Sequence, residues 1–298
     1  MIYLILAFCS SALISVIMRF GEGRINNNIS TLAVNYLICL LLSMLYSAGS
    51  SFGVPLPDGR MTIILGLISG VFYMGSFILY QYNIFRNGVL MSSTFMKLGV
   101  LVPTFAAIIV FGERPGILQV AGICLAIAGI LIVNGVGQSK QIDDSPASSG
   151  IAGQDTETNN AVKAPKALLL LLLVGGSGDA MSKFYEELGK AEYTSQYLLY
   201  TFAVALVLCT LTALMRGQRL TRRDALFGFL VGIPNYYSAR FLLLSLSEVP
   251  AVIAFPTFSV GTIILTGAAG VLLFREKMTN RQWIAVGIVI LSMILLNI

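Results

Sequence analysis

Four ionisable side chains stand inside long apolar runs of this chain: Lys97, Asp179, Lys183 and Arg240. A charge at the centre of a lipid bilayer costs about 2.5–3.5 kcal/mol even on the insertion scale, so each position needs a chemical reason. Lys97 and Arg240 have no acidic residue within a helical turn, which predicts that they bind an anionic group or borrow Asp179 across a cavity. Asp179 and Lys183 are four residues apart in the favourable order, so they are equally an intrahelical ion pair or a substrate contact.

Aromatic and polar residues accompany these charges at helical spacing. They are Tyr73, Phe77, Tyr80, Ser93, Asn235, Tyr236 and Tyr237. The first three share one helix face, and the others lie within about a turn of Lys97 or Arg240. An aromatic stripe is often simple packing, but buried tyrosine hydroxyls in lipid need partners, which favours a cavity. The sequence therefore predicts a binding cavity lined by these residues and the charges.

Several kinds of chemistry are excluded by residue types. The chain has no histidine, which removes His-based acid–base catalysis, Ser-His-Asp triads and histidine-ligated metals. The four cysteines stand singly in apolar runs, as small packing residues do, and no glycine-rich phosphate fingerprint is present. We expect no catalytic residue, no metal, no cofactor and no nucleic-acid partner. The net charge of +5 is explained by short basic clusters between helices.

The composition indicates that most of the chain lies in lipid rather than in water. Of its 298 residues, 56% are hydrophobic and 11% are charged, with a mean hydropathy of +0.84. A soluble domain needs more polar surface. A helix of about 20 apolar residues crosses a bilayer, and breaks between apolar runs predict ten such helices, at 2–20, 31–51, 61–83, 88–112, 116–135, 166–187, 193–215, 224–247, 249–274 and 280–298. The expected fold is an all-α polytopic membrane protein.

A polar segment divides the ten helices into two groups of five. Residues 136–165 are rich in Ser, Asp and Gly and poor in aromatics, which predicts a disordered linker between the halves 1–135 and 166–298. The halves repeat: "FGERPGILQ" begins at Phe111 and "FREKMTNRQ" at Phe274, an offset of 163 positions (274 − 111). Nearby offsets align Arg19-Phe20 with Lys183-Phe184, and the pair Gly66/Gly70 with Gly228/Gly232.

The odd number of helices in each half fixes how a duplication would be arranged. The second half must begin on the opposite side of the membrane, which predicts an inverted-topology repeat, typical of alternating-access transporters. The repeated junctions are then tight turns on opposite faces. Their charged residues are interpreted as structural, with Glu113 and Glu276 capping or pairing locally with Arg114 and Lys277. The glycine pairs have the spacing of close helix contacts.

The twin turns "FGERP" and "FREKM", after the fourth and ninth predicted helices of two five-helix halves, resemble the EamA-type transporters of the drug/metabolite transporter superfamily. The second copy has Arg275 where glycine is usual, and "SSALISVIMRF" replaces the usual Trp-Gly and Asn features of the first helix. The resemblance implies a cavity between helices 1–4 and 6–9, peripheral helices 5 and 10, and a bacterial cytoplasmic membrane location.

Charge distribution and resemblance give opposite orientations. The chain has 19 Lys and Arg residues, of which two, Lys97 and Arg240, lie within the predicted spans. Four lie in even-numbered connections: Arg60, Arg114, Lys183 and Lys190. The remaining thirteen lie in odd-numbered connections. The positive-inside rule then places both termini outside, whereas the resemblance implies termini inside.

These observations together predict a secondary transporter rather than an enzyme. The expected substrate is a small organic metabolite with a carboxylate, an amino acid first, moved by alternating access and, by the resemblance, exported. Arg240 and Lys97 would bind the carboxylate and Asp179 an amine. A transporter of sugar phosphates and a lipid-headgroup flippase are the alternatives. Expected partners are the substrate and lipids, with the protein a monomer or a homodimer.

Overall fold

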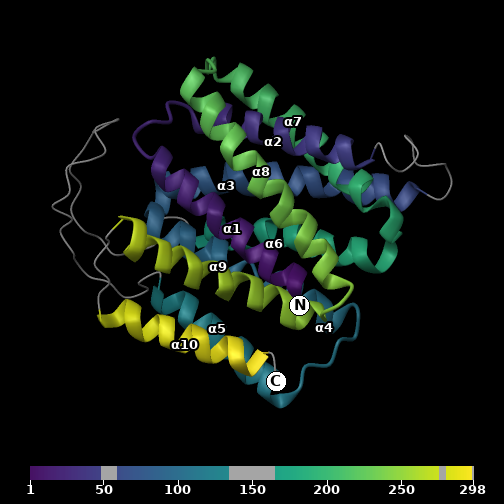
Figure 1. The fold of residues 1–298 in the computed structure, drawn as a ribbon, viewed down its shortest axis with the longest axis vertical. Helices are drawn as coiled ribbons and strands as arrows, with labels where there is room; N and C mark the ends of the chain where they lie inside the picture. Colours follow the sequence, from purple (N-terminus) through teal and green to yellow (C-terminus); the bar gives the residue numbers. More distant parts are fainter. Residues whose placement is uncertain (48–58, 134–164, 275–279, 297–298) are drawn as a thin grey trace.

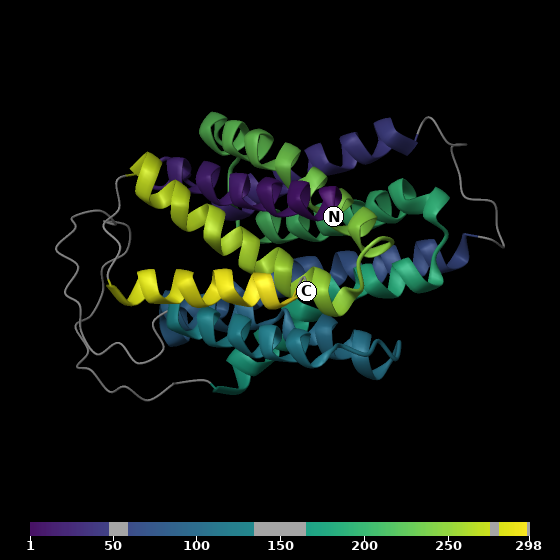
Figure 2. The same ribbon diagram turned by 60° about the horizontal axis from the view of Figure 1, so that its bottom comes forward.

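The computed structural model describes residues 1–47, 59–133, 165–274 and 280–296 (Figures 1 and 2). This part of the chain is all-helical and contains no strand. Its helices are α1 Ile2–Gly21, α2 Asn28–Ser47, α3 Arg60–Leu98, α4 Leu101–Ile109, α5 Ile117–Val133, α6 Pro165–Leu188, the 3-10 turn η1 Ala191–Tyr193, α7 Thr194–Met215, α8 Arg222–Leu246, α9 Ala251–Phe274 and α10 Asn280–Leu296. The predicted linker, up to position 164, and the turn residues Glu276 and Lys277 lie outside the described residues.

Within the described residues, six segments are long and apolar enough to cross a membrane. They are Ile2–Gly21, Asn28–Ser47, Arg60–Ile84, Pro165–Leu188, Ala191–Met215 and Ala251–Phe274. Shorter apolar helices include Phe95–Ile109 and Ile117–Ile132. The chain is therefore a multi-pass membrane protein, as its composition predicts.

The predicted break between the third and fourth helices, between residues 83 and 88, is wrong, because the backbone is helical there. α3 stays helical from Arg60 to Leu98, and regular helix is interrupted only around Gly99 and Val100. Polar residues lower the hydropathy after Ile84, but this stretch contains no proline to stop helical hydrogen bonding. At 1.5 Å per residue, its 39 residues would measure about 58 Å if straight, roughly twice the hydrocarbon thickness. α3 is therefore not a single straight crossing.

Helix α3 packs closely on α7 through two glycines. A Cβ atom on Gly66 would lie 3.0 Å from the carbonyl oxygen of Tyr197, and one on Gly70 would lie 2.6 Å from that of Thr201. Both approaches leave no room for a side chain, as in small-xxx-small helix contacts. A step of four residues along α3, from Gly66 to Gly70, moves the contact four residues forward along α7, from Tyr197 to Thr201. The two helices therefore run parallel here.

Helix α8 makes the same contact with α2. A Cβ atom on Gly228 would lie 2.6 Å from the carbonyl oxygen of Thr31, and one on Gly232 would lie 3.0 Å from that of Asn35. These helices also run parallel. The close contacts that the glycine spacing predicts are thus present at both places.

The remaining contacts also come in pairs. α1 packs against α8 and α9, and α6 packs against α3 and α4, while α2 contacts α7 and α4 contacts α9. α5 and α10 lie side by side at one edge (Figures 1 and 2).

Candidate functional site

Arg240, on α8, is surrounded by neutral groups. Its Nη1 donates hydrogen bonds to Ser195 Oγ and to Tyr236 Oη, each at 3.0 Å. Its guanidinium carbon lies 4.1 Å from the centroid of the Tyr46 ring. We call these four residues the arginine cluster. Within the described parts of the chain, no carboxylate lies at ion-pair distance from Arg240.

The tyrosines of this cluster hold one another in place. The Tyr46 and Tyr236 rings stack at 5.8 Å, and the hydroxyls of Tyr46 and Tyr237 lie 3.1 Å apart. A guanidinium above an aromatic face is stabilised by the ring quadrupole, yet its charge is not neutralised. The arrangement therefore presents a positioned cation in a neutral, aromatic setting, which suits a planar anion such as a carboxylate.

A second charged group lies between α3 and α6. Asp179 interacts electrostatically with Lys97, with Tyr73 on α3 and with Tyr197 on α7. Lys97 keeps exposed side-chain surface and Asp179 is half-buried. We call these four residues the acid–lysine group. Lys97 thus lies within electrostatic range of Asp179, but no ion pair within 4.0 Å joins them among the described residues, so the choice between the two predicted roles of Lys97 stays a prediction.

One phenylalanine joins the two groups. Phe202, on α7, is fully buried and lies 6.2 Å from the ring of Tyr73 and 6.4 Å from that of Tyr236. Both groups thus border one aromatic core, through Tyr73 of the acid–lysine group and Tyr236 of the arginine cluster. A ligand that spans them would carry an anionic end, an apolar body and a polar or cationic end.

The other predicted lining residues are placed at varying distance from these groups. Asn235 donates to Asn35 Oδ1 at 3.1 Å, next to the arginine cluster in sequence. Phe77 packs against the same hydrophobic core as Tyr73, and Tyr80 is half-buried further along α3. The side chain of Ser93 lies outside the described ones.

Lys183 does not form the predicted ion pair with Asp179. Its Nζ lies 3.1 Å from Glu113, 2.7 Å from Glu186 and 2.6 Å from Glu187, and its side chain is only 5% exposed. Glu186 and Glu187 follow on the same helix, in its last turn. Three acids therefore hold the ammonium away from Asp179.

The role of Glu113 is also different from the predicted local one. Its carboxylate accepts hydrogen bonds from the backbone N–H groups of Ala251, at 3.1 Å, and Val252, at 2.9 Å. It thus caps the start of α9, where a negative charge is favourable, while it also pairs with Lys183. Arg114 beside it is exposed, and no ion pair joins the two among the described residues.

An aromatic pair completes this contact. Phe111 and Phe184 meet edge to face with centroids 5.0 Å apart, and the Lys183 Nζ lies 5.5 Å from the Phe111 centroid. We call Lys183, Phe184, Phe111 and Glu113 the Lys183 clamp. It ties the turn after α4 to the end of α6 and to the start of α9.

The same contact is made elsewhere by the residues that align in sequence with Lys183, Phe184 and Phe111, namely Arg19, Phe20 and Phe274. Phe20 and Phe274 lie 4.8 Å apart, and the Arg19 guanidinium lies 6.0 Å from the Phe274 ring. Arg19 pairs with Glu22, three residues on, as Lys183 does with Glu186. We call Arg19, Phe20, Phe274 and Glu22 the Arg19 clamp. Its ion pair is exposed: 49% for Arg19 and 61% for Glu22.

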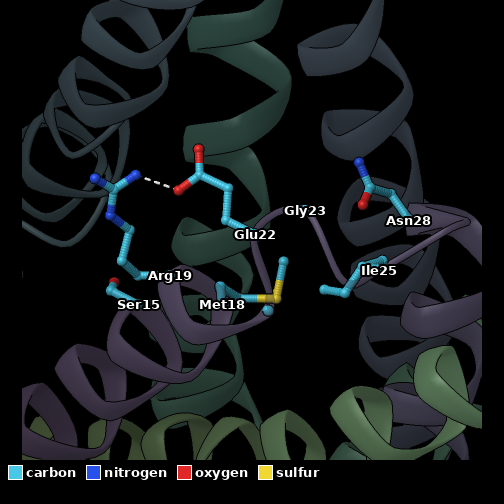
Figure 3. A pocket seen from close by; sticks show the side chains of 8 residues that line it. Ser15, Met18, Arg19, Glu22, Gly23, Ile25 and Asn28 are labelled. Atoms are coloured by element: carbon cyan, nitrogen blue, oxygen red, sulfur yellow. Dashed lines mark hydrogen bonds and ion pairs between the residues drawn. The ribbon is translucent and has the colours of Figure 1, made fainter. Parts of the chain in front are cut away.

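A pocket of about 670 Å³ opens beside the Arg19 clamp. Figure 3 shows Arg19 and Glu22 on one side of it, and Asn28 and Ile25 on the other. Ser15 and Met18 belong to the last turns of α1, so the pocket lies where α1 ends and the connection to α2 begins.

Sequence reasoning missed four residues of these groups: Tyr46, Ser195, Tyr197 and Phe202. None carries a charge that would distinguish it in an apolar run. Only their aromatic or hydroxyl character could have signalled them, and many other residues of the chain share it.

Comparison with known proteins identifies the family. The family model described as "EamA-like transporter family" matches residues 1–135 and 166–298, and the chain belongs to that family. It is therefore a membrane transporter by family, as its twin turns predict.

Two individual proteins are similar over nearly the full length. An uncharacterized protein of Haemophilus influenzae is 20% identical over 293 residues, which cover 95% of this chain and 93% of that protein. A protein of known crystal structure has a TM-score of 0.72 at 13% identity, covering 99% of this chain and 98% of its own. At this identity the likeness extends to the fold alone.

Proposed function

We propose that this protein is a secondary transporter, in a bacterial cytoplasmic membrane, that exports a small carboxylate-bearing metabolite, an amino acid first. The observation that carries the proposal is Arg240. A guanidinium inside a membrane protein normally pairs with an acid or marks a ligand path, and only hydroxyls and rings meet it in the described structure. A substrate carboxylate is the partner that this cation lacks.

The acid–lysine group supplies the other end of the substrate. Because Lys97 already interacts with Asp179, it is less available to a carboxylate than Arg240 is. A substrate ammonium would compete with Lys97 for Asp179, and the rings around Phe202 would contact the apolar body. We assign carboxylate recognition to Arg240, amine recognition to Asp179 and side-chain recognition to Tyr73 and Tyr236.

Alternating access is supported by the repeated contacts. The α3/α7 and α8/α2 glycine contacts are equivalent, and so are the Lys183 and Arg19 clamps. We propose that the halves form an inverted repeat in which each clamp closes one end of the substrate path. In this proposal the buried Lys183 clamp closes its end of the path, and the exposed Arg19 clamp, beside its pocket, leaves the other end open.

Ligand-induced stabilisation of the purified protein tests the substrate class. Amino acids, organic acids, sugar phosphates, nucleosides and quaternary amines are added in turn to wild type, to Arg240→Gln and to the control Arg60→Gln, which changes an exposed arginine at the start of α3. A ligand at a hundred times its Kd adds about 2.7 kcal/mol of stability.

We expect amino acids to stabilise wild type and Arg60→Gln, but not Arg240→Gln. Stabilisation of Arg240→Gln equal to that of wild type would remove Arg240 from the site. Stabilisation by quaternary amines alone would overturn the carboxylate assignment, and a response to sugar phosphates alone would move the substrate to the alternative class. Efflux of the stabilising compound from loaded proteoliposomes then measures transport itself.

A further inference from the structure

A basic connection adjoins an apolar groove on the outer face of α2 and α7. The groove, of about 370 Å³, is lined mainly by Ala33, Val34 and Leu37 of α2 and by Leu206, Thr210 and Leu214 of α7. Leu37 and Leu214 are 41% and 70% exposed, and the two helices lie side by side at one edge of the assembly (Figure 1). In a membrane protein such a surface faces acyl chains.

The end of this groove is polar and positively charged. A second pocket, of about 440 Å³, contains Arg216, Gln81 and Asn28, and Gln218 lines both spaces. Arg216 is fixed by a hydrogen bond from its Nη1 to Gln81, at 3.3 Å. The buried side-chain oxygen of Gln218 has no hydrogen-bond partner within the described structure. An unpaired acceptor of this kind needs a donor, which water or a bound ligand can supply.

Further arginines follow Arg216 in the same connection and at the start of α8. Arg219, Arg222 and Arg223 are exposed, and no carboxylate among the described residues lies at ion-pair distance from them or from Arg216. The nearby acid, Asp224, is buried and accepts hydrogen bonds from the backbone N–H groups of Asn26, Asn27 and Thr221. The cluster thus keeps most of its positive charge.

We propose that this surface binds one molecule of an anionic glycerophospholipid with hydroxyls in its headgroup, phosphatidylglycerol being the model ligand. An acyl chain occupies the α2/α7 groove, the phosphate meets Arg216 with the arginines around it, and a headgroup hydroxyl donates to Gln218. Basic pockets between membrane helices bind acidic headgroups in this way. The groove lies on the outer face of α2 and α7, whereas the headgroup pocket shares Ile25 and Asn28 with the pocket beside the Arg19 clamp.

Native mass spectrometry of the protein in neutral detergent tests the proposal with four probes: dioleoyl-phosphatidylglycerol, dioleoyl-phosphatidic acid, dioleoyl-phosphatidylcholine and glycerol phosphate. Arg216→Gln weakens the headgroup site, Thr210→Trp fills the groove, and Arg60→Gln is the charge-matched control. All three positions are exposed, and thermal unfolding without lipid checks that each variant is folded.

We expect one molecule of phosphatidylglycerol to bind more tightly than the other three probes. Loss of a single arginine near the membrane surface should weaken it about fivefold, Thr210→Trp should weaken it at least as much, and Arg60→Gln should not change it. Equal binding of phosphatidylcholine, or wild-type affinity in both site variants, would overturn the site. Equal binding of phosphatidic acid would overturn the hydroxyl contact, and equal binding of glycerol phosphate would overturn the lipid.

Discussion

The two clamps are built from equivalent residues, and yet they differ in how much protein covers them. In each, a cation lies over a phenylalanine ring and a second phenylalanine packs against that ring. Around Lys183, three carboxylates and the start of α9 exclude water, and 5% of the side chain remains exposed. Around Arg19, half of the side chain is exposed beside a 670 Å³ pocket.

This difference shows what an aromatic–cation contact does and does not determine. The ring contact forms whether or not the surrounding helices close over it. Burial is added by partners from elsewhere, at the Lys183 clamp by Glu113 with the first N–H groups of α9. The same local motif is therefore found both exposed and buried.

The largest expected effect is at the Lys183 clamp. Lys183→Met keeps the length of the side chain but leaves Glu113, Glu186 and Glu187 without their shared cation. Removal of one partner of a buried ion pair costs about 3 kcal/mol or more. We expect a loss of about 3 kcal/mol in the free energy of unfolding, measured by denaturant titration in detergent.

Lys183→Arg is the matched control for this change, because it keeps the charge, and it should lose much less stability. If Lys183→Met and Lys183→Arg are equally stable, the ion pairs contribute nothing and the contrast between the clamps fails.

A smaller effect, equal at two places, is expected where the glycine contacts repeat. A Cβ atom at Gly70 would lie 2.6 Å from the Thr201 carbonyl oxygen, and one at Gly228 would lie 2.6 Å from that of Thr31. Overpacking of this kind costs about 1–3 kcal/mol. Gly70→Ala and Gly228→Ala should therefore each lower thermal stability, by similar amounts.

Gly267→Ala is the control, since a Cβ atom there would meet nothing within 4 Å. An alanine in an open helical position should leave stability unchanged or raise it by about 0.5–1 kcal/mol. A tolerated change at either Gly70 or Gly228 would show that the two contacts are not equivalent.

The smallest effect is expected at the Arg19 clamp. The pair formed by Arg19 and Glu22 is 49% and 61% exposed, and exposed ion pairs contribute about 0–1 kcal/mol. Glu22→Gln, which removes this pair, should lower the free energy of unfolding by about 0.5 kcal/mol, in the same denaturant titration as Lys183→Met. A loss as large as that of Lys183→Met would mean that this end is also closed.

Sequence patterns predict those parts of the architecture that depend on the solvent and on the local spacing of residues. Apolar runs predict membrane-crossing helices because hydropathy measures the free energy of transfer into lipid. The glycine spacing predicts close contacts, and the alignment of Arg19-Phe20 with Lys183-Phe184 marks residues that do form equivalent contacts.

What the sequence could not provide is which distant segments meet. Lys183 has acids four residues before it and three and four after it, so spacing alone cannot choose between Asp179 and the pair Glu186 and Glu187. The choice depends on Glu113, which belongs to another connection. The path of α3 beyond Ile84 was mispredicted because hydropathy changes there without a residue that ends a helix.

The hydrogen bonds from Ala251 and Val252 to Glu113 also impose an order on synthesis. The acceptor precedes its donors by 138 and 139 residues, which a ribosome adds in roughly 7–28 s. Throughout that interval the turn after α4 is already in place, while its carboxylate has no α9 backbone to bind. Lys183 is added about halfway through, 70 residues after Glu113 (183 − 113). Nascent chains halted before α9 emerges should therefore be cut by protease at this turn, and full-length chains should resist.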